Sequence, residues 1–186
     1  MNLHAAPALA LSPPGVARIP PDPSLPPHER NWHERLPYRD YVELAADLAA
    51  VPSARHLLRA DLKEWGLHGL LDDAALVTTE IVANAANATR AMRWPASRPP
   101  VRMWVRGGWL RGTGILVVLA WDACPTAPVP GSPDTMDEAG RGLLFIGEYS
   151  RWGYYHPPGE NAGKVVWAEF PKPPDADAVQ GAARTE

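Results

Sequence analysis

Hydrophobic residues recur with two different periods in the central part of the chain, and each period predicts a type of element. Apolar residues three and four positions apart indicate helices over residues 53–66 and 72–92, because this spacing places them on one helix face. Pro52 before the first helix and a pair of aspartates at the start of the second are typical helix-start signals. A third, shorter helix is expected over residues 142–149.

Alternating or continuous apolar runs predict strands in the remaining segments. The expected strands are residues 42–48, 101–105, 113–121, 152–156 and 164–170. The first of these is rich in alanine and fits a helix as well. Gly107 and Gly108 predict a turn between the second and third strands. Strands outnumber helices and some are joined by tight turns, so the fold class is α+β: a two-layer α/β sandwich with a mostly antiparallel sheet and helices on one face.

The 22 prolines are concentrated at the start of the chain. Nine of them fall within residues 1–37, without an apolar period between them. Such a stretch cannot pack a core, so it is expected to be a disordered tail. A second polar, proline-bearing stretch covers residues 171–186. The folded domain is therefore expected over residues 38–170.

Composition limits the function further. A net charge of −3 gives no basic field for nucleic acid. The longest apolar run, residues 115–121, is too short to span a bilayer, and no basic residue precedes the apolar stretch near Met1 as in a signal peptide. A cytoplasmic protein without a membrane partner is expected. Cys124 is the single cysteine, so one chain can form neither an internal disulfide nor a thiolate zinc cluster.

A polar stripe on the second helix is the first candidate for chemistry. Glu80, Asn84 and Asn87 are spaced i, i+4 and i+7, so their side chains share one face. Asparagine is unfavourable inside a helix, and two within four positions cost stability. The stripe is either an ordinary solvated face or a functional pair, in which an amide oxygen binds Mg²⁺ and a carboxylate acts as a general base.

Two further motifs follow in the chain. Asp122 ends an apolar strand and is either a strand-end cap or an acceptor that selects an exocyclic amine such as adenine N6. The run of residues 140–143, Gly-Arg-Gly-Leu, opens the third helix. Its glycines either meet a need for positive φ or let backbone N–H groups approach a phosphate at the helix N-terminus.

In this order and spacing the three motifs resemble the histidine-kinase-like ATPase (GHKL) superfamily. Within it the chain is most similar to the small anti-sigma-factor serine/threonine kinases of bacteria. Residues 80–85 resemble the family's N box, residues 121–125 its first glycine box and residues 140–143 its second. The resemblance covers about residues 40–170.

The resemblance implies ATP and Mg²⁺ as cofactors and assigns roles to individual residues. Asn84 would coordinate Mg²⁺, Glu80 would activate the hydroxyl that is phosphorylated, and Asp122 would read adenine. The glycine-rich lid over the phosphates would comprise Gly140, Arg141 and Gly142.

The implied function is an ATP-binding regulator with serine/threonine kinase activity. Its partners would be a sigma factor and an anti-sigma-factor antagonist protein, and the family's dimers make a homodimer possible. Three residues depart from the family pattern: Ala88, Cys124, and Val165, which stands where a threonine commonly hydrogen-bonds the aspartate. The alternative is a catalytically inactive module that regulates a partner by sequestration.

Overall fold

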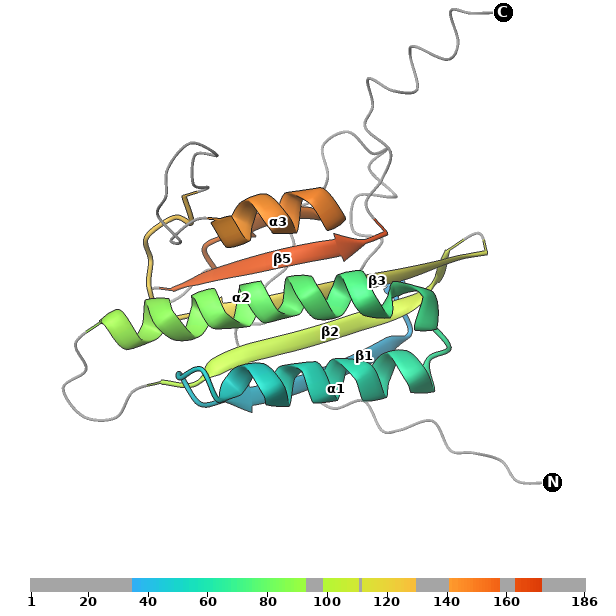
Figure 1. The fold of residues 1–186 in the computed structure, drawn as a ribbon, viewed down its shortest axis with the longest axis horizontal. Helices are drawn as coiled ribbons and strands as arrows, with labels where there is room; N and C mark the ends of the chain where they lie inside the picture. The colour runs from blue at the N-terminus through green and yellow to red at the C-terminus, as the bar shows by residue number, and fades with distance from the viewer. Residues whose placement is uncertain (1–34, 93–98, 111, 130–140, 158–162, 172–186) are drawn as a thin grey trace, which may run out of the picture.

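The protein is an open five-stranded antiparallel sheet with three helices packed on one face (Figure 1). The computed structural model describes residues 35–92, 99–110, 112–129, 141–157 and 163–171, so nearly all of the expected tails lies outside the described residues. The described elements are, in chain order, β1 (Tyr38–Leu44), α1 (Ala50–Glu64), the short 3-10 helix η2 (His68–Leu70), α2 (Leu71–Ala91), β2 (Val101–Leu110), β3 (Thr113–Asp122), α3 (Arg141–Tyr149), β4 (Arg151–Tyr155) and β5 (Lys164–Phe170).

The strand order is β1-β2-β3-β5-β4, with every neighbouring pair antiparallel. The chain therefore passes from β3 through α3 to the sheet edge at β4 and returns to pair β5 with β3. This arrangement confirms the predicted α+β class and the helices on one face. Among the described residues, no helix has both the length and the apolar character needed to cross a bilayer.

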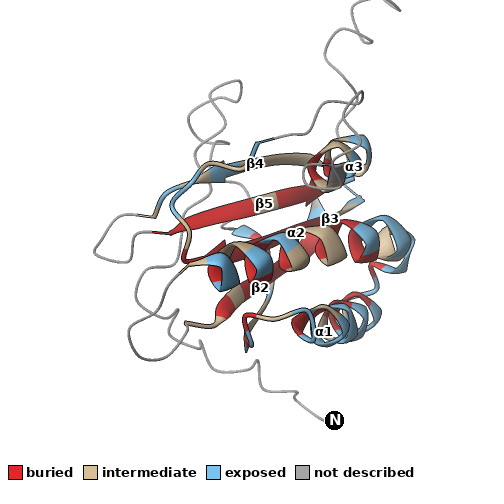
Figure 2. Ribbon diagram, turned by 60° about the vertical axis from the view of Figure 1, so that its left-hand side comes forward, coloured by how far each residue is buried: buried red, intermediate tan, exposed pale blue. Residues whose placement is uncertain are grey.

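The helix α2 lies at the centre of the helical layer, between α1 and α3 (Figure 1). Its buried positions follow the helical period, and Figure 2 shows buried residues along the helix where it meets the sheet. Val77, Ile81 and Val82 are each at most 1% exposed. Asp72 and Asp73 lie in its first turn, where carboxylates interact favourably with the helix dipole. The predicted 72–92 helix is confirmed to within one residue at each end.

The first strand lies earlier in the chain than predicted. The expected strand of 42–48 is in fact β1, Tyr38–Leu44, and residues 45–49 form a turn into α1. Leu44 is paired with Val101, the first residue of β2, so the ladder has no partner beyond it. Asp47 holds the turn, because its carboxylate accepts the Ala49 N–H at 2.9 Å.

The turn predicted at Gly107 and Gly108 is wrong, since both glycines lie inside β2. Both positions require glycine because neighbouring side chains lie against the strand there. A methyl group on Gly107 would lie 2.6 Å from the Trp65 ring, and one on Gly108 would lie 2.7 Å from Pro37 Cδ. The strands reverse later, next to Gly112, whose φ of 83° suits glycine.

A second apolar cluster covers the opposite face of the sheet. We call this surface the aromatic face and define it by Tyr41, Trp104, Trp121, Tyr155 and Trp167. Leu36 is part of the same cluster and is 5% exposed. The described part of the chain thus begins by packing on the face opposite the helices.

Candidate functional site

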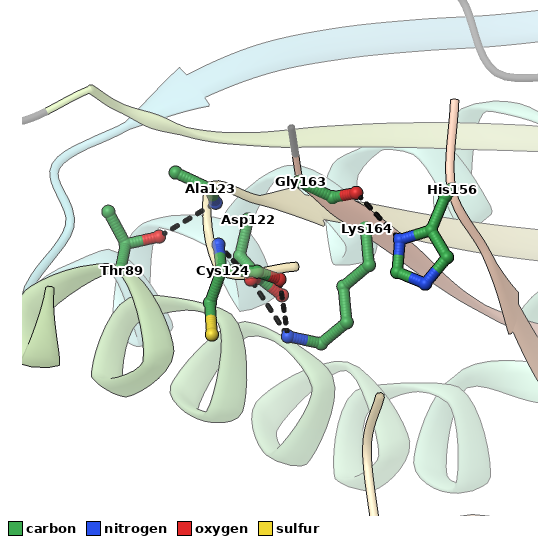
Figure 3. Close-up of polar contacts among 7 residues, drawn as sticks. All are labelled: Thr89, Asp122, Ala123, Cys124, His156, Gly163 and Lys164. Carbon is green, nitrogen blue, oxygen red and sulfur yellow. Dashed lines mark hydrogen bonds and ion pairs between the residues drawn. The ribbon is translucent and has the colours of Figure 1, made fainter. Parts of the chain in front are cut away.

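A buried ion pair lies at the ends of β3 and β5, beneath the C-terminal half of α2. Asp122 and Lys164 are direct cross-strand partners, and their side chains are 2% and 7% exposed. Lys164 Nζ donates to Asp122 Oδ1 at 2.9 Å and to the Cys124 carbonyl at 3.1 Å (Figure 3). Cys124 N–H also donates to Oδ1, at 2.9 Å.

Both donors to the Asp122 carboxylate use the same oxygen. No hydrogen bond formed within the described part of the chain reaches Oδ2. Burial raises the pKa of the Asp122 carboxyl above its ordinary value, while the bonds from Lys164 and Cys124 act in the opposite direction. The carboxylate is thus held by two donors on Oδ1, and Oδ2 keeps its capacity to accept from an N–H group.

Neighbouring contacts fix the position of this strand end. Thr89 Oγ1, on α2, accepts the Ala123 N–H at 3.3 Å, which ties the residue after Asp122 to the helix (Figure 3). On the other side, His156 Nδ1 lies 3.0 Å from the Gly163 carbonyl oxygen. Gly163 itself approaches the Asp122 backbone so closely that a methyl group there would collide with its carbonyl oxygen.

A second set of predicted residues meets further toward the N-terminus of α2. Glu80 is half-buried and Asn84 is exposed. Gly142, in the first turn of α3, packs directly on them: a methyl group there would lie 2.5 Å from Glu80 Oε2 and 3.4 Å from Asn84 Nδ2. A side chain at this position would require the Glu80 carboxylate to move away from the start of α3. Three candidates from two distant motifs are therefore in contact.

The helix α2 connects the two sets. Asn84 and Thr89 are five residues apart, which corresponds to about 7.5 Å along the helix axis. Asp122 is tied to the Thr89 end and Gly142 lies at the Asn84 end. A carboxylate acceptor and a glycine-bearing helix start are thus both held next to α2, about one and a half turns apart.

The remaining predicted residues are placed less completely. Gly140 lies outside the described residues, and Arg141 is described only as the first residue of α3. Asn87 accepts a hydrogen bond from Arg90 at 3.1 Å, so its amide serves the exposed surface of α2. Where the chain is described, no three His, Cys, Asp or Glu side chains cluster as a metal site, so a Mg²⁺ ion would need oxygen ligands from a bound phosphate besides Asn84.

The hydrogen-bond partner of Asp122 is the main residue that the sequence analysis missed. The family pattern placed the partner of Asp122 at position 165, where a threonine is common. The Val165 side chain instead belongs to the cluster on the aromatic face. The antiparallel register instead places Lys164 opposite Asp122. The period of two along residues 164–170 could have indicated that 164 and 165 point to opposite faces.

No protein-family model matches the chain, and no curated protein matches it. The chemistry of the site therefore has to be argued from its own residues.

Proposed function

We propose that this protein is an ATP-binding regulator of the histidine-kinase-like ATPase type that phosphorylates a serine or threonine on an antagonist protein. In its unengaged state it would sequester a sigma factor. The observation that carries the proposal is the alignment along α2 of Asp122 at one end and of Glu80, Asn84 and Gly142 at the other. The sheet order, with helices on one face, is compatible with that family.

Two oxygen groups support an adenine nucleotide as the proposed ligand. Asp122 Oδ2 can accept from an exocyclic amine while Lys164 and Cys124 hold the other oxygen. Asn84 is exposed, and its amide oxygen is a suitable ligand for Mg²⁺, which prefers hard oxygen ligands and takes most of the rest from phosphates and water. Bound Mg-ATP would supply the transferable phosphoryl group.

The proposal assigns the role of general base to Glu80. It is half-buried on α2, one turn before Asn84 and in contact with Gly142. A carboxylate there could take the proton from a hydroxyl brought in by a partner protein, a role that typically contributes about 10²- to 10⁴-fold to the rate. Arg141 and Gly140 would complete the start of α3 around the phosphates.

The test is nucleotide binding by the full chain. Melting temperature is measured with Mg-ATP, Mg-ADP and Mg-GTP, each with and without EDTA. Adenine nucleotides should stabilise the protein by about 2.7 kcal/mol at a hundredfold excess over Kd. GTP should do so less, because guanine presents an acceptor, O6, where Asp122 needs a donor. Equal effects of ATP and GTP would refute the adenine role of Asp122.

One observation favours a second candidate, a binding module that regulates by contact alone. The ammonium of Lys164 contacts Asp122 directly, and both side chains are almost fully buried. If a base cannot enter beside this pair, the domain would act without nucleotide. The same measurement distinguishes the two candidates. A module that acts without nucleotide should show no change in melting temperature with any nucleotide. Its binding to the partner should also be unaffected by EDTA.

A further inference from the structure

The aromatic face is the strongest unexplained surface of the molecule, and it lies on the side of the sheet opposite the proposed nucleotide site. The register places its residues in rows across the strands. Tyr41 pairs with Trp104, Trp104 with Leu119 and Leu119 with Trp167, while Trp121 pairs with Val165 in the adjacent row. Within the described residues, no helix covers this face.

Two donors on the aromatic face have no acceptor. Trp104 Nε1 and the Tyr155 hydroxyl are both buried without a hydrogen-bond partner. Trp104 is 8% exposed, and burial also raises the pKa of Tyr155. A buried donor without an acceptor loses the hydrogen bond that it makes to water in the unfolded chain, so these two atoms indicate a ligand that offers acceptors. Trp Nε1 can only donate, which narrows the ligand to groups such as carbonyl oxygens.

The spacing of the two donors fits a polyproline helix. Trp104 lies in β2 and Tyr155 in β4, which are three strands apart in the sheet, or about 14 Å. A polyproline II helix rises about 3.1 Å per residue, so five residues span this distance. Its backbone carbonyls form no internal hydrogen bonds, and aromatic surfaces are the usual recognition sites for such helices.

The chain carries a proline-rich segment shortly before the residues that pack on this face. Residues 20–27 have the sequence PPDPSLPP, with five prolines in eight positions. The chain that follows them reaches the sheet on the same side, because Leu36 belongs to the aromatic cluster and Pro37 contacts Gly108 of β2. Pro27 lies nine positions before Leu36, and this length of chain can span up to about 30 Å, enough to reach any strand of the face.

We propose that residues 20–27 dock as a polyproline II helix on the aromatic face of their own domain, with backbone carbonyls accepting from Trp104 Nε1 and the Tyr155 hydroxyl. Proline suits this role for two reasons. Its fixed φ lowers the entropy lost on docking, and its missing N–H leaves no unpaired donor against the apolar sheet. This inference does not depend on nucleotide binding.

The test compares the full chain with a variant in which Pro20, Pro21, Pro23, Pro26 and Pro27 are all replaced by serine. Both are labelled with 5-fluorotryptophan and measured by ¹⁹F NMR. The Trp104 and Trp121 signals should move in the variant, while that of Trp109 should not, because it is 55% exposed and lies outside the aromatic cluster. Single Trp→Phe variants assign the signals.

A synthetic peptide of residues 18–29 provides the second arm. It should bind the proline-free variant at least tenfold more tightly than the wild type, whose own segment competes. Adding Tyr155→Phe to the variant keeps the ring and removes only the hydroxyl donor, and it should weaken peptide binding about threefold to tenfold. Adding Trp104→Phe removes the indole N–H together with part of the ring and should weaken peptide binding at least as much. Trp109→Phe is the matched control and should leave peptide affinity unchanged.

Two results would overturn the proposal. Unchanged Trp104 and Trp121 signals together with no peptide binding would show that the segment does not dock. Signals that depend on protein concentration, with a dimeric mass in light scattering, would assign the face to the segment of a second copy instead.

Discussion

Asp122 and Lys164 face each other across two antiparallel strands and form an ion pair that is almost completely buried. The pair anchors the position at which we place base recognition, because it holds one carboxylate oxygen and leaves the other as an acceptor. Burying two charges is costly, so the pair contributes to stability only while both partners are present.

Replacing Lys164 should therefore strongly lower the stability of the folded protein. In Lys164→Met the carboxylate stays buried with the Cys124 N–H as its remaining partner, and the free energy of unfolding at pH 7 should fall by about 3–5 kcal/mol. The double variant Asp122→Asn/Lys164→Met should recover most of that loss. Urea denaturation measures it, with Lys63→Met, an exposed lysine of α1, as the control. A Lys164→Met protein as stable as wild type would mean that the pair is not formed in solution.

Substitutions at two positions of the polar stripe on α2 should affect nucleotide binding and phosphate transfer separately. Asn84→Ala should weaken nucleotide binding only when magnesium is present, because it removes a metal ligand. Glu80→Gln should bind nucleotide nearly normally and lose phosphate transfer by about 10²- to 10⁴-fold. Asn87→Ala is the matched control on the same face and should change neither. If Glu80→Gln transfers phosphate as fast as wild type, Glu80 is not the base.

A side chain at position 142 should displace the Glu80 carboxylate. Gly142→Ala places a methyl group against Glu80 Oε2, and moving this flexible carboxylate aside should cancel most of the roughly 1 kcal/mol that alanine gains over glycine in a helix. Gly147→Ala, in the same helix, meets only ordinary contacts near Trp152 and should gain up to about 1 kcal/mol from better helix propensity. Thermal unfolding of both variants checks this. Equal stability changes would indicate that Gly142 is not in contact with α2.

Asp61 should make stability depend on pH. It is 6% exposed, and burial, assisted by nearby Asp40, raises its pKa from 3.8 to about 7. A raised folded-state pKa means that the folded protein holds this proton more tightly. The contribution of protonated Asp61 to stability is thus complete below pH 4 and is lost as the pH rises from about 4 to 7. Over this range the free energy of unfolding should fall by at most about 1.4 kcal/mol per pH unit.

Asp61→Asn should remove that slope and leave a protein that is more stable than wild type above pH 7. Chemical denaturation at intervals between pH 5 and 8 provides the measurement. Asp73→Asn, an exposed carboxylate of α2, should keep the wild-type slope. A wild-type curve that rises over this range because of Asp61 would contradict the assignment.

The sequence determined much of this protein through local patterns. The helical period defined α2 to within one residue, because one face of that helix must be apolar to cover a sheet. The long apolar run of β3 ended at Asp122 as expected. The same patterns placed Glu80 and Asn84 on one helix face, which is a property of the helix alone.

Relations between distant segments were decided only by the tertiary structure. Gly107 and Gly108 signal a turn in sequence, yet they lie within β2 because Trp65 and Pro37 pack against them. The contact of Gly142 with Glu80 joins two motifs more than 60 residues apart. A pattern of polar and apolar residues encodes which way a side chain points but not what it meets.

Lys164 shows the same limit most clearly. Its sequence context marks only the start of a strand, and its pairing with Asp122 follows from the register of β3 against β5. Register depends on how two strands 42 residues apart align over a shared core, and a shift by one residue would turn Lys164 to the opposite face. Local sequence therefore predicted the carboxylate, while only the packed sheet determined its partner.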